Sequence, residues 1–264
     1  MTGLAGVSLS LEGRVALITG GSRGIGASTV KMFVSAGAKV AFNYQKARAE
    51  AEEIVQQCGL ENCLALACDL NGIEPAAELV SATVRRFGRL DILVANHGIW
   101  VADAVPIERM SDEQWRRTQA IDLDSVFGLV KHAVAQMKRQ KKPHPATGNI
   151  VLVSSTAGQR GEAFHCDYAA AKGALISMVK GLSTELAPAG IYVNCVAPGW
   201  VETDMSRPAL SDPASREAIF SVIPLQRVGR PEEVAAPILF LCTEHAGFIT
   251  GEIFNVNGGA VLVG

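Results

Sequence analysis

The chain alternates short apolar runs with segments of helical length, and this alternation constrains its fold more than any other feature. The first four runs lie at residues 14–19, 38–43, 63–68 and 90–95. Short continuous apolar runs are typical of parallel strands buried on both faces, which need crossover helices between them. No long linker interrupts the pattern. The sequence therefore predicts parallel βαβ units in one doubly wound α/β sheet.

A glycine-rich segment directly follows the first run. After Thr19 the chain reads Gly-Gly-Ser-Arg-Gly-Ile-Gly up to Gly26, and a helical pattern continues through Val30 and Phe33. Glycines permit a tight turn and close approach of the backbone, while the free N–H groups of a helix start favour a pyrophosphate. Strand, glycine loop and helix in this order predict a dinucleotide site, although the spacing differs from G-x-G-x-x-G. A glycine turn without a ligand is the alternative.

The residues after the second apolar run bear on the choice of cofactor. An acid there accepts a hydrogen bond from the ribose 2′-hydroxyl of NAD and repels the 2′-phosphate of NADP. Residues 43–46 are Asn-Tyr-Gln-Lys, and the first acid is Glu50. Arg23 in the glycine loop adds a cation, so we expect NADP(H) rather than NAD(H). Arg23 and Lys46 also fit solvated surface charges.

Tyr168 and Lys172 are spaced to share one face of a predicted helix. An ammonium near a phenol favours the phenolate and lowers the pKa of the Tyr from its ordinary value of about 10. Alone, the pair also fits an ordinary helix surface. The fifth apolar run, 149–154, delivers Ser155 at its carboxyl end, where open α/β sheets bind ligands. A hydroxyl and a Tyr–Lys pair facing a nicotinamide would complete a site for hydride transfer.

Composition argues against several classes of function. Lys+Arg 24 against Asp+Glu 26 leaves no basic field for nucleic acid or an anionic membrane surface. No apolar run reaches the roughly 18 residues of a membrane span, and the N-terminus lacks the pattern of a signal peptide. The 6 Cys show no metal-binding spacing, so we expect no metal site and read them as buried thiols in the reducing cytoplasm.

A cluster of cations ends the helical pattern at residues 126–137. The cluster comprises Lys138, Arg139, Lys141 and Lys142, just before Pro143. Cations suit the carboxyl end of a helix. The cluster therefore fits either a solvated helix end or a basic patch for an acidic partner.

Seven short motifs make the chain resemble the classical short-chain dehydrogenase/reductases from about residue 12 to 260. They are Thr-Gly-Gly-Ser-Arg-Gly-Ile-Gly at 19–26, Cys68-Asp69-Leu70, Asn96-His97-Gly98, Ser154-Ser155, Tyr168 with Lys172, Asn194 with Pro198-Gly199, and Thr250-Gly251 with Asn257-Gly258-Gly259. The resemblance implies one NAD(P)-binding Rossmann domain over residues 1–264. Its fold would be a seven-stranded parallel sheet in the order 3-2-1-4-5-6-7 with helices on both faces, with residues 191–197 and 252–256 as the last strands.

The resemblance also implies roles for polar residues. Ser155 would orient the substrate carbonyl, Tyr168 would act as acid/base, and Lys172 would lower the pKa of Tyr168 and bind the ribose. Asp122 joins this catalytic set at a position where most relatives carry Asn, whose backbone carbonyl helps to hold a proton-relay water. The implied cofactor contacts are Gly20, Ser22, Arg23, Gly24, Ile25, Gly26, Asn43, Tyr44, Gln45, Asp69, Leu70, Asn96, Gly98, Tyr168, Lys172, Pro198, Gly199, Val201 and Thr203.

Two residues depart from the family pattern. We expect the relay to persist, with the Asp122 carboxylate either solvated or paired with a cation such as Lys172. His97 replaces the Ala of the usual Asn-Ala-Gly motif. We expect it to be a packed, hydrogen-bonded loop residue rather than a catalyst.

The resemblance implies an oxidoreductase that transfers a hydride between NADP(H) and a carbonyl or secondary alcohol. The run from Pro198 to Met205 resembles 3-oxoacyl-[acyl-carrier-protein] reductases, so the expected substrate is an acyl-thioester carbonyl or a small ketone. Against the former, Ala189 stands where those reductases often carry a basic residue. Residues 200–229 are expected to form a lid over the substrate. Trp100, Phe164, His165, Cys166, Trp200 and Met205 are candidates to line the pocket, and each also fits core or lid packing.

Two other classes of function stay open. One is a cofactor-sensing protein of this fold without turnover, which only Asp122 favours. The other is an epimerase or dehydratase, whose extended family usually has a longer C-terminal substrate domain. We expect a homotetramer or dimer that associates through helices around 115–140 and 168–186. Phe127 and Met178 would project outward there or be buried within the chain.

Overall fold

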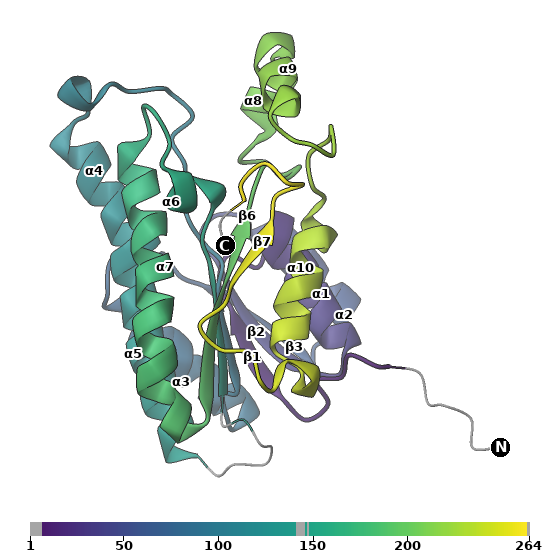
Figure 1. Ribbon diagram of the computed structural model, residues 1–264. Helices are drawn as coiled ribbons and strands as arrows, with labels where there is room; N and C mark the ends of the chain where they lie inside the picture. The colour runs from purple at the N-terminus through teal and green to yellow at the C-terminus, as the bar shows by residue number, and fades with distance from the viewer. Residues whose placement is uncertain (1–6, 141–145, 147, 263–264) are drawn as a thin grey trace.

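Seven parallel strands form one sheet in the order β3-β2-β1-β4-β5-β6-β7 in the computed structural model, which describes residues 7–140, 146 and 148–262 (Figure 1). The strands are β1 (Val15–Ile18), β2 (Lys39–Tyr44), β3 (Cys63–Ala67), β4 (Ile92–Ala95), β5 (Gly148–Val153), β6 (Ile191–Pro198) and β7 (Ile253–Val256). The predicted sheet and strand order are confirmed. Only the strand ends differ, by one or two residues.

Helices cover both faces of this sheet. The helices are α1 (Gly24–Ser35), α2 (Arg48–Cys58), α3 (Pro75–Phe87), α4 (Asp112–Gln119), α5 (Ser125–Arg139), α6 (Thr156–Arg160), α7 (Cys166–Leu186), α8 (Arg207–Ser211), α9 (Pro213–Ser221) and α10 (Pro231–Leu241). Short 3₁₀ turns are η1 (Ile107–Arg109), η3 (Ala187–Ala189) and η4 (Glu244–Ala246). Helices α1, α2 and α10 lie on one face, and α3, α5 and α7 lie on the other (Figure 1). No helix within the described ranges is long and apolar enough to cross a membrane.

Two apolar layers fill the space between the sheet and its helices. Val30, Phe33 and Ile238 belong to the layer beneath α1 and α10. Leu129 and Leu175 belong to the layer beneath α5 and α7. Every residue of β1 and β4 is buried, because both faces of these central strands are covered. This explains why the strands appear in the sequence as continuous apolar runs.

A π-helical turn, η2 (Ala120–Asp124), separates α4 from α5. The helix expected around residues 115–140 is present as α4, η2 and α5 in succession, with this irregular turn within it. A π turn takes one more residue per turn than an α-helix, which rotates the side chains that follow. Asp122 lies within this turn and is completely buried. The irregular turn thus places a carboxylate inside the molecule at the carboxyl end of the sheet.

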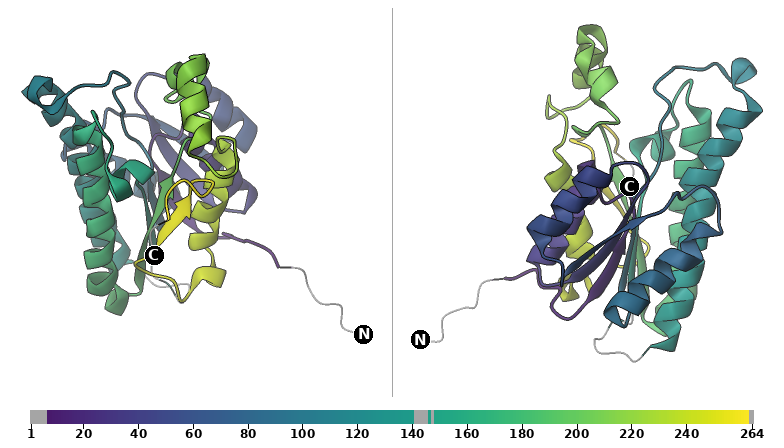
Figure 2. Two further views of the ribbon diagram at one scale, coloured as in Figure 1. Left: turned by 45° about the horizontal axis from the view of Figure 1, so that its top comes forward. Right: turned by 180° about the vertical axis from the view of Figure 1, so that it is seen from behind.

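The carboxyl ends of all seven strands meet at one edge of the sheet because the strands are parallel. The segment 200–229 projects beyond this edge, and α8 and α9 form its tip (Figure 2). Loops at this edge surround the space in which a ligand binds in sheets of this kind.

Candidate functional site

A cavity of about 620 Å³ runs along the carboxyl edge of the sheet. The glycine loop and the start of α1 line one part of it, and Ser155, Tyr168 and Lys172 line another. The cofactor residues expected from the sequence that line this cavity are Gly20, Ser22, Arg23, Gly24, Ile25, Asn43, Tyr44, Gln45, Asp69, Leu70, Asn96, Gly98, Tyr168, Lys172, Pro198, Gly199, Val201 and Thr203. Gly26 and Asp122 do not line it. Residues that the sequence analysis assigned to one site therefore line one cavity, although they come from distant segments of the chain.

The start of α1 fits a pyrophosphate. Arg23 is the N-cap residue and makes no side-chain capping bond, so the first N–H groups of the helix have no side-chain acceptor. Gly24 begins the helix with a φ of +53°, a region that favours glycine. A Cβ at Gly26 would lie 2.0 Å from the Gly20 carbonyl oxygen, so Gly26 allows the loop to pack on the helix. The loop therefore has the free donors and the close packing that a dinucleotide requires.

Asn43 holds the loop rather than presenting its side chain to a ribose. Its Oδ1 accepts from the Gly20 N–H at 2.8 Å, and its Nδ2 donates to the Cys68 carbonyl at 3.0 Å. The cavity wall continues along residues 44–47, which contain no acid. The Arg23 guanidinium lies 3.7 Å from the Asp204 carboxylate and is largely exposed. Arg23 therefore places a cation at the surface beside the glycine loop rather than in the core.

Three of the four expected catalytic side chains converge from the end of β5 and from α7. Ser155 is the N-cap of α6, and its Oγ accepts from the Ala157 N–H at 3.1 Å. The Ser155 side chain also lies close enough to Tyr168 to lower its pKa. One turn along α7, the Lys172 Nζ lies 5.7 Å from the centroid of the Tyr168 ring and donates to the Val153 carbonyl at 3.2 Å. A hydroxyl, a phenol and an ammonium thus lie together.

Asp122 pairs with Lys172 instead of being solvated. The Lys172 Nζ lies 3.6 Å from Asp122 Oδ2, and the two side chains are only 4% and 0% exposed. Asp122 Oδ1 accepts from the Ile99 N–H at 2.8 Å. Oδ2 is buried without a hydrogen-bond partner among the described residues. Of the two environments expected for this carboxylate, the structure shows the ion pair.

Burial and charge act in opposite directions on the site. Burial raises the pKa of Tyr168, Lys172 lowers it, and Asp122 raises it again, with a net increase. Burial opposes the charge on Lys172, but Asp122 and Tyr168 hold its pKa above the ordinary value. Burial raises the pKa of Asp122. The Lys172 ammonium lowers the pKa of Asp122 in turn, so each member of the pair favours the charged form of the other. Lys172 thus lowers the pKa of Tyr168, as expected, but burial and Asp122 more than offset this contribution in the protein without cofactor.

His97 is a packed, hydrogen-bonded loop residue, as expected. Its Nδ1 lies 2.7 Å from Thr19 Oγ1, and its Nε2 lies 2.7 Å from Ser125 Oγ. Thr19 Oγ1 already accepts from the Asn96 N–H, and Ser125 Oγ donates to the Ile121 carbonyl. These bonds assign the proton to Nε2. Burial lowers the pKa of His97 to about 3, with a further decrease from Lys172, so the ring is neutral.

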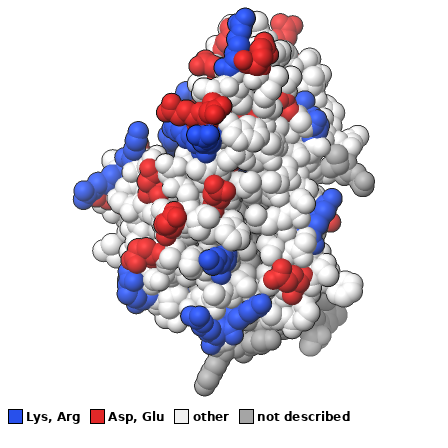
Figure 3. Space-filling view, turned by 90° about the vertical axis from the view of Figure 1, so that its left-hand side faces the viewer, with Lys and Arg blue, Asp and Glu red and all other residues white. Residues whose placement is uncertain are grey.

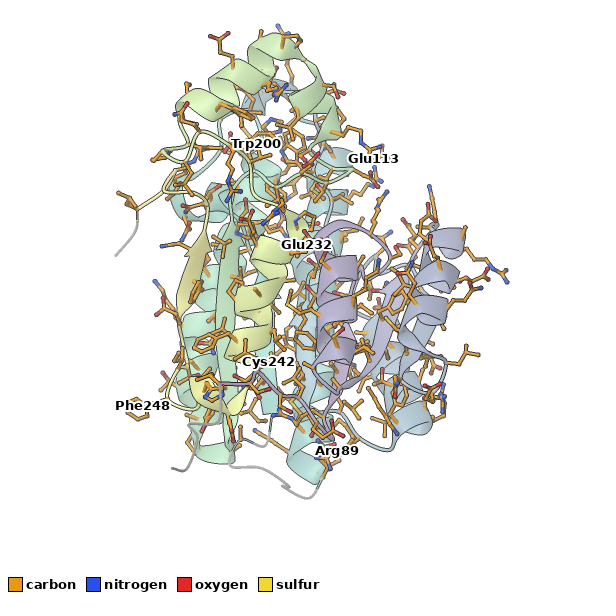
Figure 4. The ribbon with its side chains drawn as sticks, turned by 90° about the vertical axis from the view of Figure 1, so that its right-hand side faces the viewer. Arg89, Glu113, Trp200, Glu232, Cys242 and Phe248 are labelled. Carbon is orange, nitrogen blue, oxygen red and sulfur yellow. The ribbon has the colours of Figure 1, made fainter. Side chains whose placement is uncertain are left out.

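Aromatic and apolar side chains surround the space beside Tyr168. The rings of Trp100 and Trp200 meet edge to face with centroids 5.8 Å apart, and both line the cavity with Met205. Trp200 lies at the base of the segment that carries α8 and α9, far from Phe248 at the other end of the molecule (Figure 4). The remaining candidates, Phe164, His165 and Cys166, do not line the cavity. The His165 ring contacts the Trp100 ring at an angle of 42° with centroids 5.1 Å apart, and Phe164 is exposed.

Sequence reasoning missed two charged residues of this wall. Arg160 and Glu162 line the cavity and form an ion pair with a nitrogen–oxygen distance of 2.8 Å. Arg160 ends α6 and Glu162 lies in the loop that follows, where no periodic pattern distinguishes a cavity residue from a surface residue. Among the described residues, no group of three or more His, Cys, Asp or Glu side chains is arranged to hold a metal ion.

The face over α4, α5 and α7 carries charges of both signs around a largely uncharged centre (Figure 3). Lys138 and Arg139 form the last turn of α5, and Lys141 and Lys142 lie outside the described residues. Phe127 is 46% exposed. Met178 packs against the core beneath α7 instead of projecting freely.

Comparison with known proteins agrees with this geometry. A family model described as enoyl-(acyl carrier protein) reductase matches residues 20–261. The chain is 40% identical over 257 residues to the 3-oxoacyl-[acyl-carrier-protein] reductase FabG of Escherichia coli, covering 97% of this chain and 100% of that protein. It is 37% identical over 256 residues to the 3-oxoacyl-[acyl-carrier-protein] reductase of Synechocystis, covering 96% and 99%. A crystal structure from Brucella melitensis, titled short-chain dehydrogenase/reductase and glucose/ribitol dehydrogenase, superposes with a TM-score of 0.88 at 34% identity, covering 97% of this chain and 100% of that one.

Proposed function

This chain belongs to the short-chain dehydrogenase/reductase family, and we propose that it is an NADP(H)-preferring carbonyl reductase in which Tyr168 supplies the proton. Members of this family are NAD(P)-dependent oxidoreductases that act on CH–OH and C=O groups, and so is this chain. One observation carries the finer proposal. Ser155, Tyr168 and Lys172 line the same cavity as the uncapped start of α1.

These side chains divide the proton chemistry between them. A nicotinamide cofactor, when bound, supplies or accepts the hydride. Tyr168 holds a proton at Oη and passes it to the carbonyl oxygen, on which negative charge develops. Ser155, which lines the cavity beside Tyr168, donates to the same oxygen and stabilises that charge. The Lys172 ammonium then stabilises the phenolate that remains.

The preference for NADP(H) rests on charge around the adenosine part of the cavity. Residues 43–46 carry no carboxylate that would repel a 2′-phosphate. Arg23 and Lys46 both line the cavity, and Arg23 is largely exposed. A guanidinium is suited to a phosphate because its donors form a fixed fork.

The substrate proposed is a neutral carbonyl compound with an apolar substituent. Trp100, Trp200 and Met205 offer apolar surface beside Tyr168. Arg160, the last residue of α6, is already paired with Glu162. A 3-oxoacyl thioester, as the names of the relatives suggest, or a small ketone matches this lining. The segment 200–229 would close over it as a lid, and the exposed Phe127 on α5 would lie in the interface of a dimer or tetramer.

The experiment is oxidation of NADPH and of NADH with acetoacetyl thioester, small aliphatic ketones and aryl ketones as substrates. We expect faster turnover with NADPH and a preference for substrates with an apolar substituent over ketones that carry a carboxylate. Equal or better turnover with NADH would refute the cofactor preference. Tight cofactor binding without turnover of any carbonyl compound would favour the cofactor-sensing alternative, which the unusual Asp122–Lys172 pair supports.

A further inference from the structure

We propose that Asp122 is a positioning residue that acts through Lys172 to keep the proton on Tyr168, and so adapts the site to reduction rather than oxidation. This inference rests on the proposed role of Tyr168 as the acid. It assigns a function to the carboxylate itself, which a backbone role in a proton relay does not need.

The carboxylate is fixed in place from two sides. The π turn buries it completely, and the Ile99 N–H holds Oδ1 at 2.8 Å. Oδ2 faces the Lys172 Nζ at 3.6 Å and has no hydrogen-bond partner among the described residues. A Cβ at Gly98 would lie 3.0 Å from that Nζ and 3.1 Å from Oδ2. The absence of a side chain at Gly98 therefore leaves room for the two charges to approach each other.

Charge compensation follows from this distance. An unpaired ammonium beside a buried phenol favours the phenolate, because charges interact strongly where water is excluded. A carboxylate at 3.6 Å cancels much of that field. The pKa of Tyr168 agrees, since burial and Asp122 raise it and only part of this is offset by Lys172 and Ser155. Tyr168 therefore remains protonated in the protein without cofactor.

The other titratable groups around Asp122 and Lys172 do not compensate the charge of Lys172 in the same way. Those facing Tyr168, Lys172 or Asp122 are Glu162, Cys195, His97 and Asp167. Glu162 is paired with Arg160, and Asp167 accepts from Thr118 Oγ1 at 2.8 Å. Burial raises the pKa of Cys195 to about 12, and His97 is neutral, so both are uncharged at neutral pH. Asp122 is the carboxylate in direct contact with Lys172.

The protonation state of Tyr168 decides which direction the resting enzyme is ready to catalyse, although it leaves the equilibrium between ketone and alcohol unchanged. In reduction, the carbonyl carbon gains a hydride from the reduced nicotinamide, while the Tyr168 O–H bond breaks and its proton passes to the carbonyl oxygen. Tyr168 then regains a proton from water. Oxidation of an alcohol needs the phenolate first, to accept the hydroxyl proton. A site that holds the proton on Tyr168 is therefore ready for reduction at neutral pH.

Ultraviolet titration of phenolate absorbance in the cofactor-free protein tests the proposal. The chain has 3 Tyr, so subtracting the Tyr168→Phe spectrum isolates Tyr168. We expect Asp122→Asn, which can keep the bond from the Ile99 N–H, to lower the Tyr168 transition by about one pH unit or more. Asp124→Asn is the matched control, because it removes an exposed carboxylate two residues away and should leave the transition unchanged. Asp122→Glu keeps the charge and should stay closer to the native transition than Asp122→Asn.

The pH profiles give a second reading. In Asp122→Asn, the acid limb of kcat/KM for alcohol oxidation and the alkaline limb for ketone reduction should both move to lower pH. An unchanged Tyr168 transition in a folded Asp122→Asn protein would overturn the proposal. If that variant does not fold, Asp122→Ser takes its place with the same expectation. The titration needs no substrate. Absence of turnover would therefore refute the proposed function, while the Tyr168 transition could still be measured and compared between the variants.

Discussion

The Asp122 carboxylate and the Lys172 ammonium lie 3.6 Å apart, and both side chains are almost completely buried. Removing one member of a buried ion pair leaves the other charge unpaired, which typically destabilises a protein by about 3–5 kcal/mol. We expect this loss in Lys172→Met, measured as the free energy of unfolding in denaturant. Lys172→Met with Asp122→Asn removes both charges, so much of the stability should return. Equal loss in the single and double variants would show that the pair is not coupled.

Two helical glycines provide a matched test of the glycine loop. A Cβ at Gly26 would lie 2.0 Å from the Gly20 carbonyl oxygen and 2.7 Å from Asn96 Nδ2, so Gly26→Ala must displace the loop. We expect weaker binding of NADPH by at least about tenfold, measured by fluorescence titration. At Gly181 in α7 no atom lies within 4 Å of the added Cβ. Gly181→Ala should leave binding unchanged and stabilise the protein by up to about 1 kcal/mol. Unimpaired binding in Gly26→Ala would contradict this account of the loop.

His97 should make stability depend on pH in acid. Its folded pKa of about 3 lies below the ordinary value of 6.5, so the unfolded chain binds the additional proton between these limits. The stabilisation is thus complete above pH 6.5 and decreases as the pH falls towards 3. Its slope approaches about 1.4 kcal/mol per pH unit. The free energy of unfolding should be measured across this pH range. Its slope against pH should be smaller than that of the native protein by this amount in His97→Gln. His245→Gln, which changes an exposed imidazole, should keep the native slope. Identical slopes in both variants would refute the assignment of a buried neutral ring.

A carboxylate introduced after β2 should reverse the cofactor preference. Gln45 is exposed and lines the cavity, so Gln45→Asp places a negative charge where a 2′-phosphate is expected. We expect kcat/KM with NADPH to fall at least about tenfold and the value with NADH to rise. Gln45→Asn controls for the shorter side chain. If the ratio of kcat/KM with NADPH to kcat/KM with NADH stays unchanged in Gln45→Asp, the adenosine end of the cofactor must bind elsewhere in the cavity.

Local patterns explain why much of the fold was predictable. Strands such as β1 and β4 are continuous apolar runs because both faces are covered, and the glycine loop follows β1 directly. Tyr168 and Lys172 could be placed together because a regular helix fixes their relative orientation. The order of the strands came from the family resemblance, since periodicity alone does not state which strands are neighbours.

Contacts between distant or irregular segments were not predictable in the same way. The π turn that carries Asp122 has no signature in the sequence. Only the three-dimensional structure therefore shows that its carboxylate is paired rather than solvated. The edge-to-face contact of Trp100 and Trp200 joins loops a hundred positions apart. The Tyr168 pKa lies above its ordinary value mainly because of burial, and the sequence spacing to Lys172 does not reveal burial.

The central claim is that Tyr168 supplies the proton for carbonyl reduction, and Tyr168→Phe tests it most directly. The measurement is NADPH oxidation with acetoacetyl thioester and with the best ketone substrate, beside NADPH binding and the unfolding midpoint of the same protein. We predict that kcat falls by about 10²–10⁴-fold, the usual contribution of a positioned general acid, while binding and stability change little. A Tyr168→Phe protein that binds NADPH and retains native kcat would contradict the account.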